Sequence, residues 1–168
     1  MLKEMLEDCG AIKYGEFTLT SGKKSNYYVD IKLASTRPDI LKKIAEGMNE
    51  KVDGEKIAGM ELGAVPIATA AALESGLPFL MVRKESKGHG TKGRIEGTFN
   101  EGETVTVVED VTTTGGSAVE TVEVLRDMGA EVNRVLVVVD REEGAEEKLD
   151  DIDVELMPLV TASELVED

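Results

Sequence analysis

The 168-residue sequence has no long hydrophobic run. No segment approaches the roughly 18 consecutive apolar residues that identify a membrane-spanning helix. The N-terminus, MLKEMLEDCG, also lacks the apolar stretch of a secretory signal peptide. We therefore expect a cytoplasmic protein that has no membrane partner.

Cysteine is nearly absent, because Cys9 is the one cysteine of the chain. A lone thiol excludes an internal disulfide, and it excludes a zinc site built from several cysteines. Disulfide-stabilised secreted scaffolds and zinc modules therefore do not fit. Cys9 is expected to be an inert thiol near the end of a short helix.

Positive charge is scarce as well, because 19 Lys+Arg against 34 Asp+Glu leave a net charge of -15. A surface this negative repels nucleic acid, so no nucleic-acid partner is expected. The few cations are distributed unevenly, and residues 83 to 94 hold Arg83, Lys84, Lys87, His89, Lys92 and Arg94. Such a cluster in an acidic chain predicts a local anion-binding site.

The remaining pattern is typical of one α/β domain that spans residues 1–168. Apolar runs of strand length alternate with segments of helical periodicity, which predicts a mostly parallel central sheet flanked by helices. The expected strands are Lys56–Met60, Phe79–Val82, Thr104–Val108 and Val132–Val139. The expected helices are Leu2–Asp8, Pro38–Val52, Pro66–Ser75 and Ser117–Met128, with Ser35 or Thr36 as the cap of the second.

Two segments stand outside this alternation. Phe17–Asp30 (FTLTSGKKSNYYVD) alternates polar and apolar residues around a Ser-Gly-Lys turn, which predicts a small N-terminal hairpin. Lys84–Thr98 (KESKGHGTKGRIEGT) contains four glycines and mixed charge without apolar periodicity. A loop of that length in a small domain is typical of a flexible lid or a disordered insertion.

The most informative motif runs from Val105 to Ser117 (VTVVEDVTTTGGS). An apolar strand, Val105–Val108, is expected to bring Glu109 and Asp110 to the carboxyl end of the sheet, where open α/β folds bind ligands. Hydroxyl residues and glycines follow and lead directly into a helix. Glycine lets backbone N–H groups turn inward, and a helix N-terminus favours a phosphate dianion.

Carboxylates beside a phosphate cradle indicate a ligand that carries hydroxyls as well as phosphate. A ribose 5-phosphate satisfies both, because carboxylates accept hydrogen bonds from ribose hydroxyls. The alternative is a polar strand end followed by an ordinary turn and helix cap, but strand, acid pair, hydroxyl-glycine loop and helix occur here in register. The loop has neither the lysine of a P-loop nor the spacing of a dinucleotide fingerprint.

This motif resembles the signature of type I phosphoribosyltransferases. The resemblance implies the fold of that family, with a hairpin hood and a long flexible catalytic loop. It implies that the two carboxylates contact the ribose hydroxyls of 5-phosphoribosyl 1-pyrophosphate (PRPP), and that Thr113–Ser117 wrap its 5'-phosphate. The substrate-binding residues implied in this segment are Glu109, Asp110, Val111, Thr112, Thr113, Thr114, Gly115, Gly116 and Ser117.

Three further segments resemble orotate phosphoribosyltransferases. Arg83–Gly90 (RKESKGHG) is similar to their catalytic loop, Phe17–Asp30 to their substrate hairpin, and Val137–Ala145 (VVVDREEGA) extends the match. The resemblance implies that pyrophosphate is bound by Arg83, Lys84, Lys87 and His89, and that orotate is contacted by Thr113 and Arg141. Arg141 directly follows an expected strand, on the same rim as Asp110, and an arginine there suits a carboxylate.

By this resemblance, the chain is expected to transfer the 5-phosphoribosyl group from PRPP to orotate, giving orotidine 5'-monophosphate and pyrophosphate in pyrimidine biosynthesis. Lys87, His89 and Asp110 are the implied catalytic residues. Mg²⁺ is the expected cofactor, held mainly through the pyrophosphate and ribose hydroxyls rather than by a metal site of the protein. The family also implies a homodimer with shared active sites.

The chain departs from the family at two places. Thr20 stands where many relatives carry a lysine, and Glu61–Ala64 lacks an aromatic-lysine pair that some relatives have. Both departures concern contacts to pyrophosphate. Lys84, Lys87 and Lys92 are also compatible with ordinary solvated loop charges.

Two other functions remain open. A purine phosphoribosyltransferase shares the Val105–Ser117 motif but needs neither the hairpin nor Arg141. A regulator that binds PRPP and controls transcription requires a nucleic-acid surface, which no segment of this acidic chain offers.

Overall fold

A six-stranded sheet forms the centre of the computed structural model, which describes residues 1–86, 88 and 91–167, with 91 and 92 described by their backbone alone. The strand order is β5-β4-β3-β6-β7-β8. All neighbours pair in parallel except β5, which is antiparallel to β4 at one edge. The strands are β3 (Lys56–Met60), β4 (Phe79–Val82), β5 (Ile95–Glu96), β6 (Val105–Thr112), β7 (Arg134–Asp140) and β8 (Glu155–Thr161). The predicted α/β class and mostly parallel sheet are confirmed.

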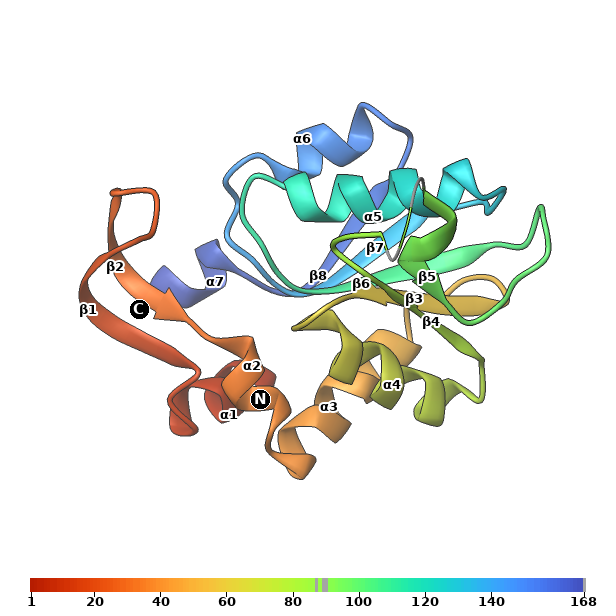
Figure 1. Ribbon diagram of the computed structural model, residues 1–168. Coiled ribbons are helices and arrows are strands. Elements are labelled where there is room, and N and C mark those ends of the chain that lie inside the picture. Colours follow the sequence, from red (N-terminus) through yellow and green to blue (C-terminus); the bar gives the residue numbers. More distant parts are fainter. Residues whose placement is uncertain (87, 89–90, 168) are drawn as a thin grey trace.

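Helices cover both faces of this sheet (Figure 1). One face carries α3 (Pro38–Asn49) and α4 (Ala64–Ser75), and the other carries α5 (Gly116–Asp127) and α6 (Ala145–Asp150). Each face has its own cluster of buried apolar side chains. The sheet is therefore buried on both sides, which explains why its strands read as nearly continuous apolar runs.

Strand β6 contributes alternate side chains to the two clusters, because successive residues of a strand point to opposite faces. Val108 packs on the α3–α4 side, whereas Val107 packs on the α5–α6 side. The alternation continues, so that Glu109 follows Val107 and Asp110 follows Val108. The two neighbouring carboxylates therefore lie on opposite faces of the sheet.

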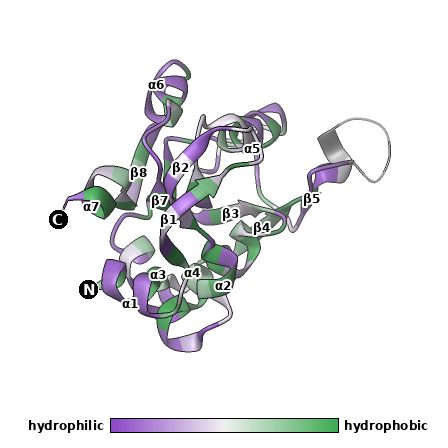
Figure 2. Cartoon of the chain, turned by 90° about the vertical axis from the view of Figure 1, so that its left-hand side faces the viewer, coloured by the Kyte–Doolittle hydropathy of each residue, from purple (hydrophilic) through white to green (hydrophobic). Residues whose placement is uncertain are grey.

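The N-terminal hairpin forms a separate two-stranded sheet. β1 (Ile12–Thr18) pairs antiparallel with β2 (Lys24–Val29), with α1 (Leu2–Asp8) before the pair and α2 (Ile31–Ser35) after it. Tyr27 of β2 is buried and joins the α3–α4 cluster. Figure 2 shows the hairpin lying across the front of the central sheet. The predicted hairpin is confirmed, and its first strand begins earlier than expected, at Ile12.

Strand and helix boundaries differ from the sequence-based expectation at β6 and α4. β6 does not end at Val108 but continues to Thr112, because its last residues still pair with β7. α4 begins at Ala64, two residues before Pro66, so the proline lies inside the first turn of the helix. The carboxylates of β6 are consequently part of the strand rather than of the loop that follows it.

The expected caps of α3 are wrong. Arg37 is its N-cap residue and makes no side-chain capping bond, while Ser35 and Thr36 end α2, a helix that the periodicity does not indicate. Strand β8 and the short helices α6 and α7 (Ala162–Val166) are likewise not indicated by the sequence pattern. The two helices are too short to show a clear apolar period, and β8 (ELMPLVT) contains Pro158, a residue that argues against a strand except at the edge of a sheet.

The segment Lys84–Thr98, expected as one long loop, is partly structured. A 3-10 turn, η1 (Thr91–Arg94), leads into β5, which pairs with the end of β4. The predicted lid residues Lys87 and His89 lie outside the described residues.

None of the described helices is long and apolar enough to cross a membrane. Cys9 directly follows α1, as expected, and its thiol donates a hydrogen bond to the Leu6 carbonyl at 3.4 Å.

Candidate active site

A cavity of about 520 Å³ lies between the hairpin and the carboxyl ends of β6 and β7. Its walls come from segments that are far apart in the sequence. Of the predicted site residues it includes Asp110, Val111, Thr113, Thr114 and Arg141, and the hairpin and α2 add Lys23, Tyr28 and Lys32. The cavity therefore brings Asp110, one of the two predicted ribose-binding carboxylates, together with the predicted orotate-binding residues Thr113 and Arg141.

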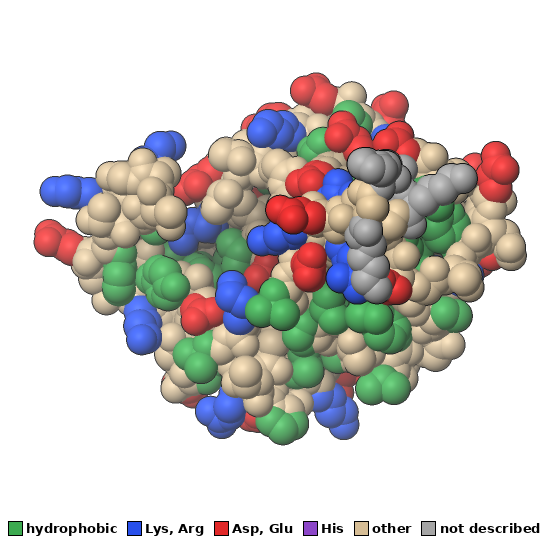
Figure 3. All heavy atoms as spheres, in the orientation of Figure 1, with side chains coloured by type: hydrophobic (Ala, Val, Ile, Leu, Met, Phe, Trp, Pro, Cys, Tyr) green, Lys and Arg blue, Asp and Glu red, His purple; other side chains and the backbone are tan. Residues whose placement is uncertain are grey.

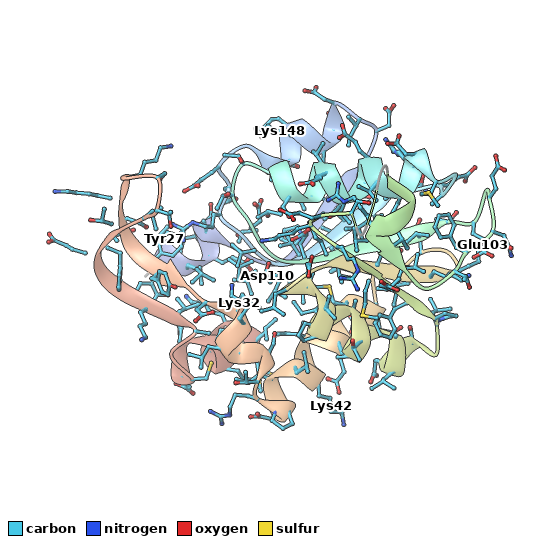
Figure 4. All side chains as sticks on the ribbon, viewed as in Figure 1. Tyr27, Lys32, Lys42, Glu103, Asp110 and Lys148 are labelled. Atoms are coloured by element: carbon cyan, nitrogen blue, oxygen red, sulfur yellow. The ribbon has the colours of Figure 1, made fainter. Side chains whose placement is uncertain are left out.

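Asp110 faces this cavity with a side chain that is 20% exposed. Its Oδ1 accepts a hydrogen bond from the backbone N–H of Val111 at 2.9 Å, which fixes the carboxylate. Its Oδ2 lies 3.9 Å from the Lys32 ammonium, and Figure 4 shows these two side chains together at the centre of the molecule. Gly63, at the start of α4, packs so closely against the carboxylate that any Cβ would overlap it. Glycine at this turn is therefore required for Asp110 to keep its place.

Arg141 follows β7 and is buried, with 7% of its surface exposed. Its Nη2 donates to Ser25 Oγ at 3.2 Å, and its guanidinium carbon lies 4.3 Å from the centre of the Tyr27 ring. Its Nε has no hydrogen-bond partner and lies 3.7 Å from the carboxylate of Glu143. A buried donor without an acceptor, beside an open cavity, suits an anionic ligand.

The loop after β6 forms a smaller cavity of about 130 Å³ at the N-terminus of α5. Its lining comprises Glu109, Val111 and the continuous run from Thr112 to Ala118. No side chain caps α5, so the N–H groups of its first turn remain for a ligand. The predicted cradle residues thus surround one concave surface.

Different physical constraints explain why glycine occupies positions 115 and 116 of the cradle. Gly115 adopts a φ of +85°, and a Cβ there would lie 2.9 Å from the Cα of Ala145, so the packing of α6 against the loop requires glycine. At Gly116 a Cβ would point into open space. Because Gly116 lines the cavity, its missing side chain leaves room for a ligand rather than for the fold.

Glu109 lines the cradle from the face of β6 opposite to Asp110. It is buried, and its Oε1 has no hydrogen-bond partner. Burial raises the pKa of Glu109 to about 8, with a further upward contribution from the charge of Asp110 and a downward one from Lys84. The carboxyl is therefore largely protonated at neutral pH, so it does not repel a phosphate in the cradle.

Two ion pairs fasten the ends of the predicted pyrophosphate-binding segment. Arg83 Nε lies 2.9 Å from Glu96 Oε1 in β5, and Arg94 Nη2 lies 2.6 Å from Glu120 Oε1 in α5. The Arg94 Nε also donates to the Arg83 carbonyl at 3.0 Å. Both arginines of the predicted cation cluster are thus engaged by carboxylates at the base of the segment.

The turn before α4, residues 61 to 63, contacts the beginning of the segment 83–94. The peptide bond between Glu61 and Leu62 is cis. Glu61 Oε1 accepts a hydrogen bond from the backbone N–H of Lys84 at 2.8 Å, while the Lys84 side chain is exposed. The turn that holds Asp110 in place through Gly63 is therefore also bonded to the start of the predicted lid.

Charge is distributed unevenly around the site. In the view of Figure 3, lysine and arginine side chains lie among acidic ones in the middle of the molecule, whereas the side chains over α6 are mostly acidic with Lys148 among them. The basic residues of the large cavity are Lys23, Lys32 and Arg141. Its acidic residues are Asp110 and Glu143, so the lining holds three basic side chains against two acidic ones in a chain with a net charge of -15. This relative excess of positive charge suits an anionic substrate.

Comparison with known proteins agrees with this geometry. Residues 35–160 match the family model of the phosphoribosyl transferase domain. The sequence is 54% identical over 166 residues to the orotate phosphoribosyltransferase of Methanocaldococcus jannaschii, covering 98% of this chain and 94% of that protein. The chain belongs to the orotate phosphoribosyltransferase family.

Solved structures of orotate phosphoribosyltransferases have the same fold. The Aeropyrum pernix structure matches with a TM-score of 0.88 at 35% identity, covering 99% of this chain and 96% of that one. The Mycobacterium tuberculosis structure in complex with PRPP matches with a TM-score of 0.81 at 33% identity, covering 98% of this chain and 96% of that one. The central sheet and the N-terminal hairpin are therefore shared features of orotate phosphoribosyltransferases.

Sequence reasoning singles out neither Tyr27, which stacks on Arg141, nor Lys32, which lies beside Asp110. Tyr27 carries a signal in the alternation of the hairpin, which places it on the buried face, but nothing local indicates that it stacks on Arg141. Lys32 belongs to α2, which the pattern does not indicate, so its approach to Asp110 is visible only in the folded chain.

The described residues contain no group of three or more His, Cys, Asp or Glu side chains that could hold a metal ion. Asp110 presents a carboxylate to the large cavity, and Glu109 is turned to the other face. This donor set fits Mg²⁺ bound through a substrate, because Mg²⁺ in such sites uses one or two carboxylates together with substrate phosphates and keeps several waters.

Proposed function

We propose that this member of the orotate phosphoribosyltransferase family joins orotate to PRPP, giving orotidine 5'-monophosphate and pyrophosphate, and that residues 1–168 act as one catalytic unit. The observation that carries the proposal is the presence of two complementary groups in one cavity: the guanidinium of Arg141 and the fixed carboxylate of Asp110. The first suits the carboxylate of orotate, and the second suits ribose hydroxyls. Their strands, β6 and β7, are neighbours in the sheet, so base and sugar can meet.

The cradle would hold the 5'-phosphate through the backbone N–H groups and hydroxyls of residues 113 to 117, with Val111 and Thr112 forming its base. Thr113 lines both cavities, which supports a contact to orotate as well as to phosphate. Glu109 is largely protonated near neutral pH, so it would donate its proton in a hydrogen bond to the sugar-phosphate from inside the cradle. Asp110, on the other face, would accept from a ribose hydroxyl.

The reaction breaks the bond from the anomeric carbon to pyrophosphate and forms a bond to the base nitrogen. The contribution of the chain is positioning and charge stabilisation. Arg83, Lys84, Lys87 and His89 would bind the leaving pyrophosphate, with Arg83 exchanging its partner Glu96 for pyrophosphate oxygens. Lys87 and His89 would supply positive charge and a proton, while lid closure excludes water.

Mg²⁺ would be held mainly by pyrophosphate oxygens and ribose hydroxyls, next to Asp110. When bound, it neutralises charge on the departing pyrophosphate and on the carboxylate beside it. Removal of Mg²⁺ with a chelator is expected to stop turnover, and its replacement is expected to restore it.

The direct test is formation of orotidine 5'-monophosphate by the purified protein, with adenine, hypoxanthine and uracil as competing bases. Turnover with orotate and PRPP, but with none of the other bases, supports the proposal. Preference for a purine base would assign the chain to purine salvage, and PRPP binding without turnover of any base would favour a regulatory role. Asp110→Asn should weaken use of PRPP by roughly 1.5–3 kcal/mol, as for a charge-assisted hydrogen bond.

The proposal includes a homodimer in which the lid of one chain completes the cradle of the other. A two-fold interface would give two composite sites, so Lys87→Ala and Asp110→Asn subunits, once mixed, would form hybrids with one doubly damaged and one intact site. Activity after subunit exchange should rise well above that of either parent. If each lid serves its own chain, every site keeps one lesion and the mixture is no more active than the average of its parents.

A further inference from the structure

We infer that Tyr27 is a positioning residue that fixes the guanidinium of Arg141 for the carboxylate of orotate, so that the N-terminal hairpin controls which base the sheet accepts. The inference rests on the proposed function, and it adds a role for a residue that touches Arg141 rather than the cavity itself. Tyr27 is absent from the lining of the large cavity, whereas its neighbour Tyr28 is part of that lining.

The geometry of the pair is that of a stacked cation. The guanidinium carbon of Arg141 lies 4.3 Å from the centre of the Tyr27 ring, well inside the range of a cation–π contact. Both residues are 7% exposed. The contact is therefore desolvated, which strengthens it relative to the same contact on the surface.

The same strand of the hairpin adds a second restraint on Arg141. Ser25 Oγ accepts from Arg141 Nη2 at 3.2 Å and donates to the carbonyl of Tyr27 at 2.8 Å. One hydroxyl thus ties the arginine to the backbone of the residue that carries the ring. The plane of a guanidinium determines where all its donors point. The Tyr27 ring and the Ser25 hydroxyl together therefore fix the direction of the other N–H groups of Arg141.

The arginine needs such restraint because carboxylates surround it on its own loop. Asp140 and Glu142 flank it in sequence, and Glu143 lies 3.7 Å from its Nε. Asp140 Oδ1 accepts from Thr112 Oγ1 at 2.8 Å, so that carboxylate already has a partner.

Glu142 is engaged as well, because its Oε2 accepts from the N–H and the hydroxyl of Ser163 in α7 at 2.7 and 2.6 Å. Glu143 is the nearest remaining competitor. It already forms an ion pair with Arg141 Nε at 3.7 Å, and an arginine free to rotate would tighten this pair and turn its other donors away from the substrate. Stacking on Tyr27 fixes the plane of the guanidinium, so that the pair stays beyond hydrogen-bond distance and the remaining donors face the carboxylate of the base.

The consequence is specific to one substrate. A change at Tyr27 should weaken recognition of the orotate carboxylate and leave PRPP unaffected, because the cradle lies on the other face of β6 and Asp110 is held by its own contacts. A merely structural role in the hairpin would affect both substrates or the turnover number.

The experiment compares steady-state kinetics of the wild type, Tyr27→Leu, Tyr27→Phe and Ser25→Ala. Tyr27→Leu should raise KM for orotate about tenfold, the loss of a desolvated cation–π contact, with KM for PRPP and kcat within about twofold. Tyr27→Phe keeps the ring and should retain nearly the wild-type KM for orotate. Ser25→Ala leaves a small side chain in place and should raise KM for orotate by about two- to fivefold.

Tyr14→Leu is the matched control, because Tyr14 pairs opposite Tyr27 in the hairpin and its hydroxyl donates to Glu7 Oε1 at 2.6 Å. It should leave KM for orotate unchanged. An unchanged KM for orotate in folded Tyr27→Leu, or an equal rise in Tyr14→Leu, overturns the inference. If Tyr27→Leu does not fold, Ser25→Ala decides, and a KM for orotate equal to wild type overturns it. Absence of wild-type turnover would instead reject the proposed function, and the inference with it.

Discussion

The two faces of β6 carry the two halves of the site, and they are built in different ways. On the α5 face, the cradle is made of one continuous run, Thr112 to Ala118, joined by Glu109 and Val111. On the hairpin face, the cavity draws on the hairpin, α2, β6 and the loop after β7, and its bond between Ser25 and Arg141 joins residues 116 positions apart. The proposed phosphate site therefore lies within one short motif, whereas the proposed base site depends on contacts between segments that are distant in the sequence.

The neighbouring carboxylates of β6 show the same contrast in electrostatic form. Glu109 is buried, and burial is the largest of the causes that raise its pKa to about 8. Asp110 is partly exposed, accepts from a backbone N–H and has Lys32 at 3.9 Å. One step along a strand thus changes the face, the solvent access and the polar partners of two otherwise similar side chains.

The largest expected effect concerns the cradle on the α5 face, which is made of one continuous run of residues. Gly116→Val should abolish detectable binding of PRPP, a loss of at least about 100-fold, because the branched side chain occupies the space left for the phosphate while the fold is kept. Calorimetric titration with PRPP and thermal unfolding measure the two quantities. Gly115→Val should in addition lower the melting temperature, since it combines a positive φ with contact to Ala145. Normal binding by Gly116→Val would place the cradle elsewhere.

Arg141→Met tests the cavity on the hairpin face, which is assembled from distant segments. Removing the buried guanidinium should raise KM for orotate about 10- to 100-fold, as for a hydrogen bond to a charged group of roughly 1.5–3 kcal/mol. KM for PRPP should change by less than about twofold, because the cradle does not depend on this residue. Steady-state kinetics with each substrate varied in turn separates the two. Equal losses for both substrates would show that the halves are not independent.

Glu109→Gln tests the difference between the two carboxylates through pH. The folded chain keeps a proton on Glu109 up to about pH 8, while an ordinary glutamate has a pKa of 4.5, so wild-type stability should fall as pH rises between these values and level off above them. The glutamine variant lacks this slope. Its stability relative to wild type should therefore rise by roughly several kcal/mol between pH 4 and pH 9, whereas the cost of burying its amide is the same at both pH values and lowers the whole curve.

Urea unfolding of both proteins at pH 4, 6, 8 and 9 measures this difference. Parallel stability curves for wild type and Glu109→Gln would contradict the raised pKa.

The smallest effect is expected at Lys32, on the border between the halves. Lys32→Met removes an exposed cation 3.9 Å from Asp110, so KM for PRPP should rise by no more than about fivefold, in line with a surface ion pair of about 0–1 kcal/mol. Lys42→Met, on α3 and far from Asp110 in Figure 4, is the matched control. An effect at Lys32 that disappears at high salt would confirm its electrostatic origin. Equal KM values for the two variants would remove Lys32 from the site.

The central strands and the cradle were predictable because their signals are local. Apolar runs of strand length located β3, β4 and β7 to within two residues, and the order strand, acid pair, hydroxyl-glycine loop, helix located the cradle. The end of β6 was not predictable in the same way. Its last residues are polar, and they remain in the strand only because β7 offers them pairing partners.

The sequence by itself determined the α/β class, the hairpin and the family, since each follows from periodicity or from a contiguous motif. Tertiary structure alone decided which face each carboxylate occupies relative to the cavities, that Tyr27 lies under Arg141, and that Lys32 reaches Asp110. The physical reason is that these relations depend on the register of β6 with its neighbours and on the docking of the hairpin. Both are set by packing between segments that are distant along the chain, and no local pattern of residues records them.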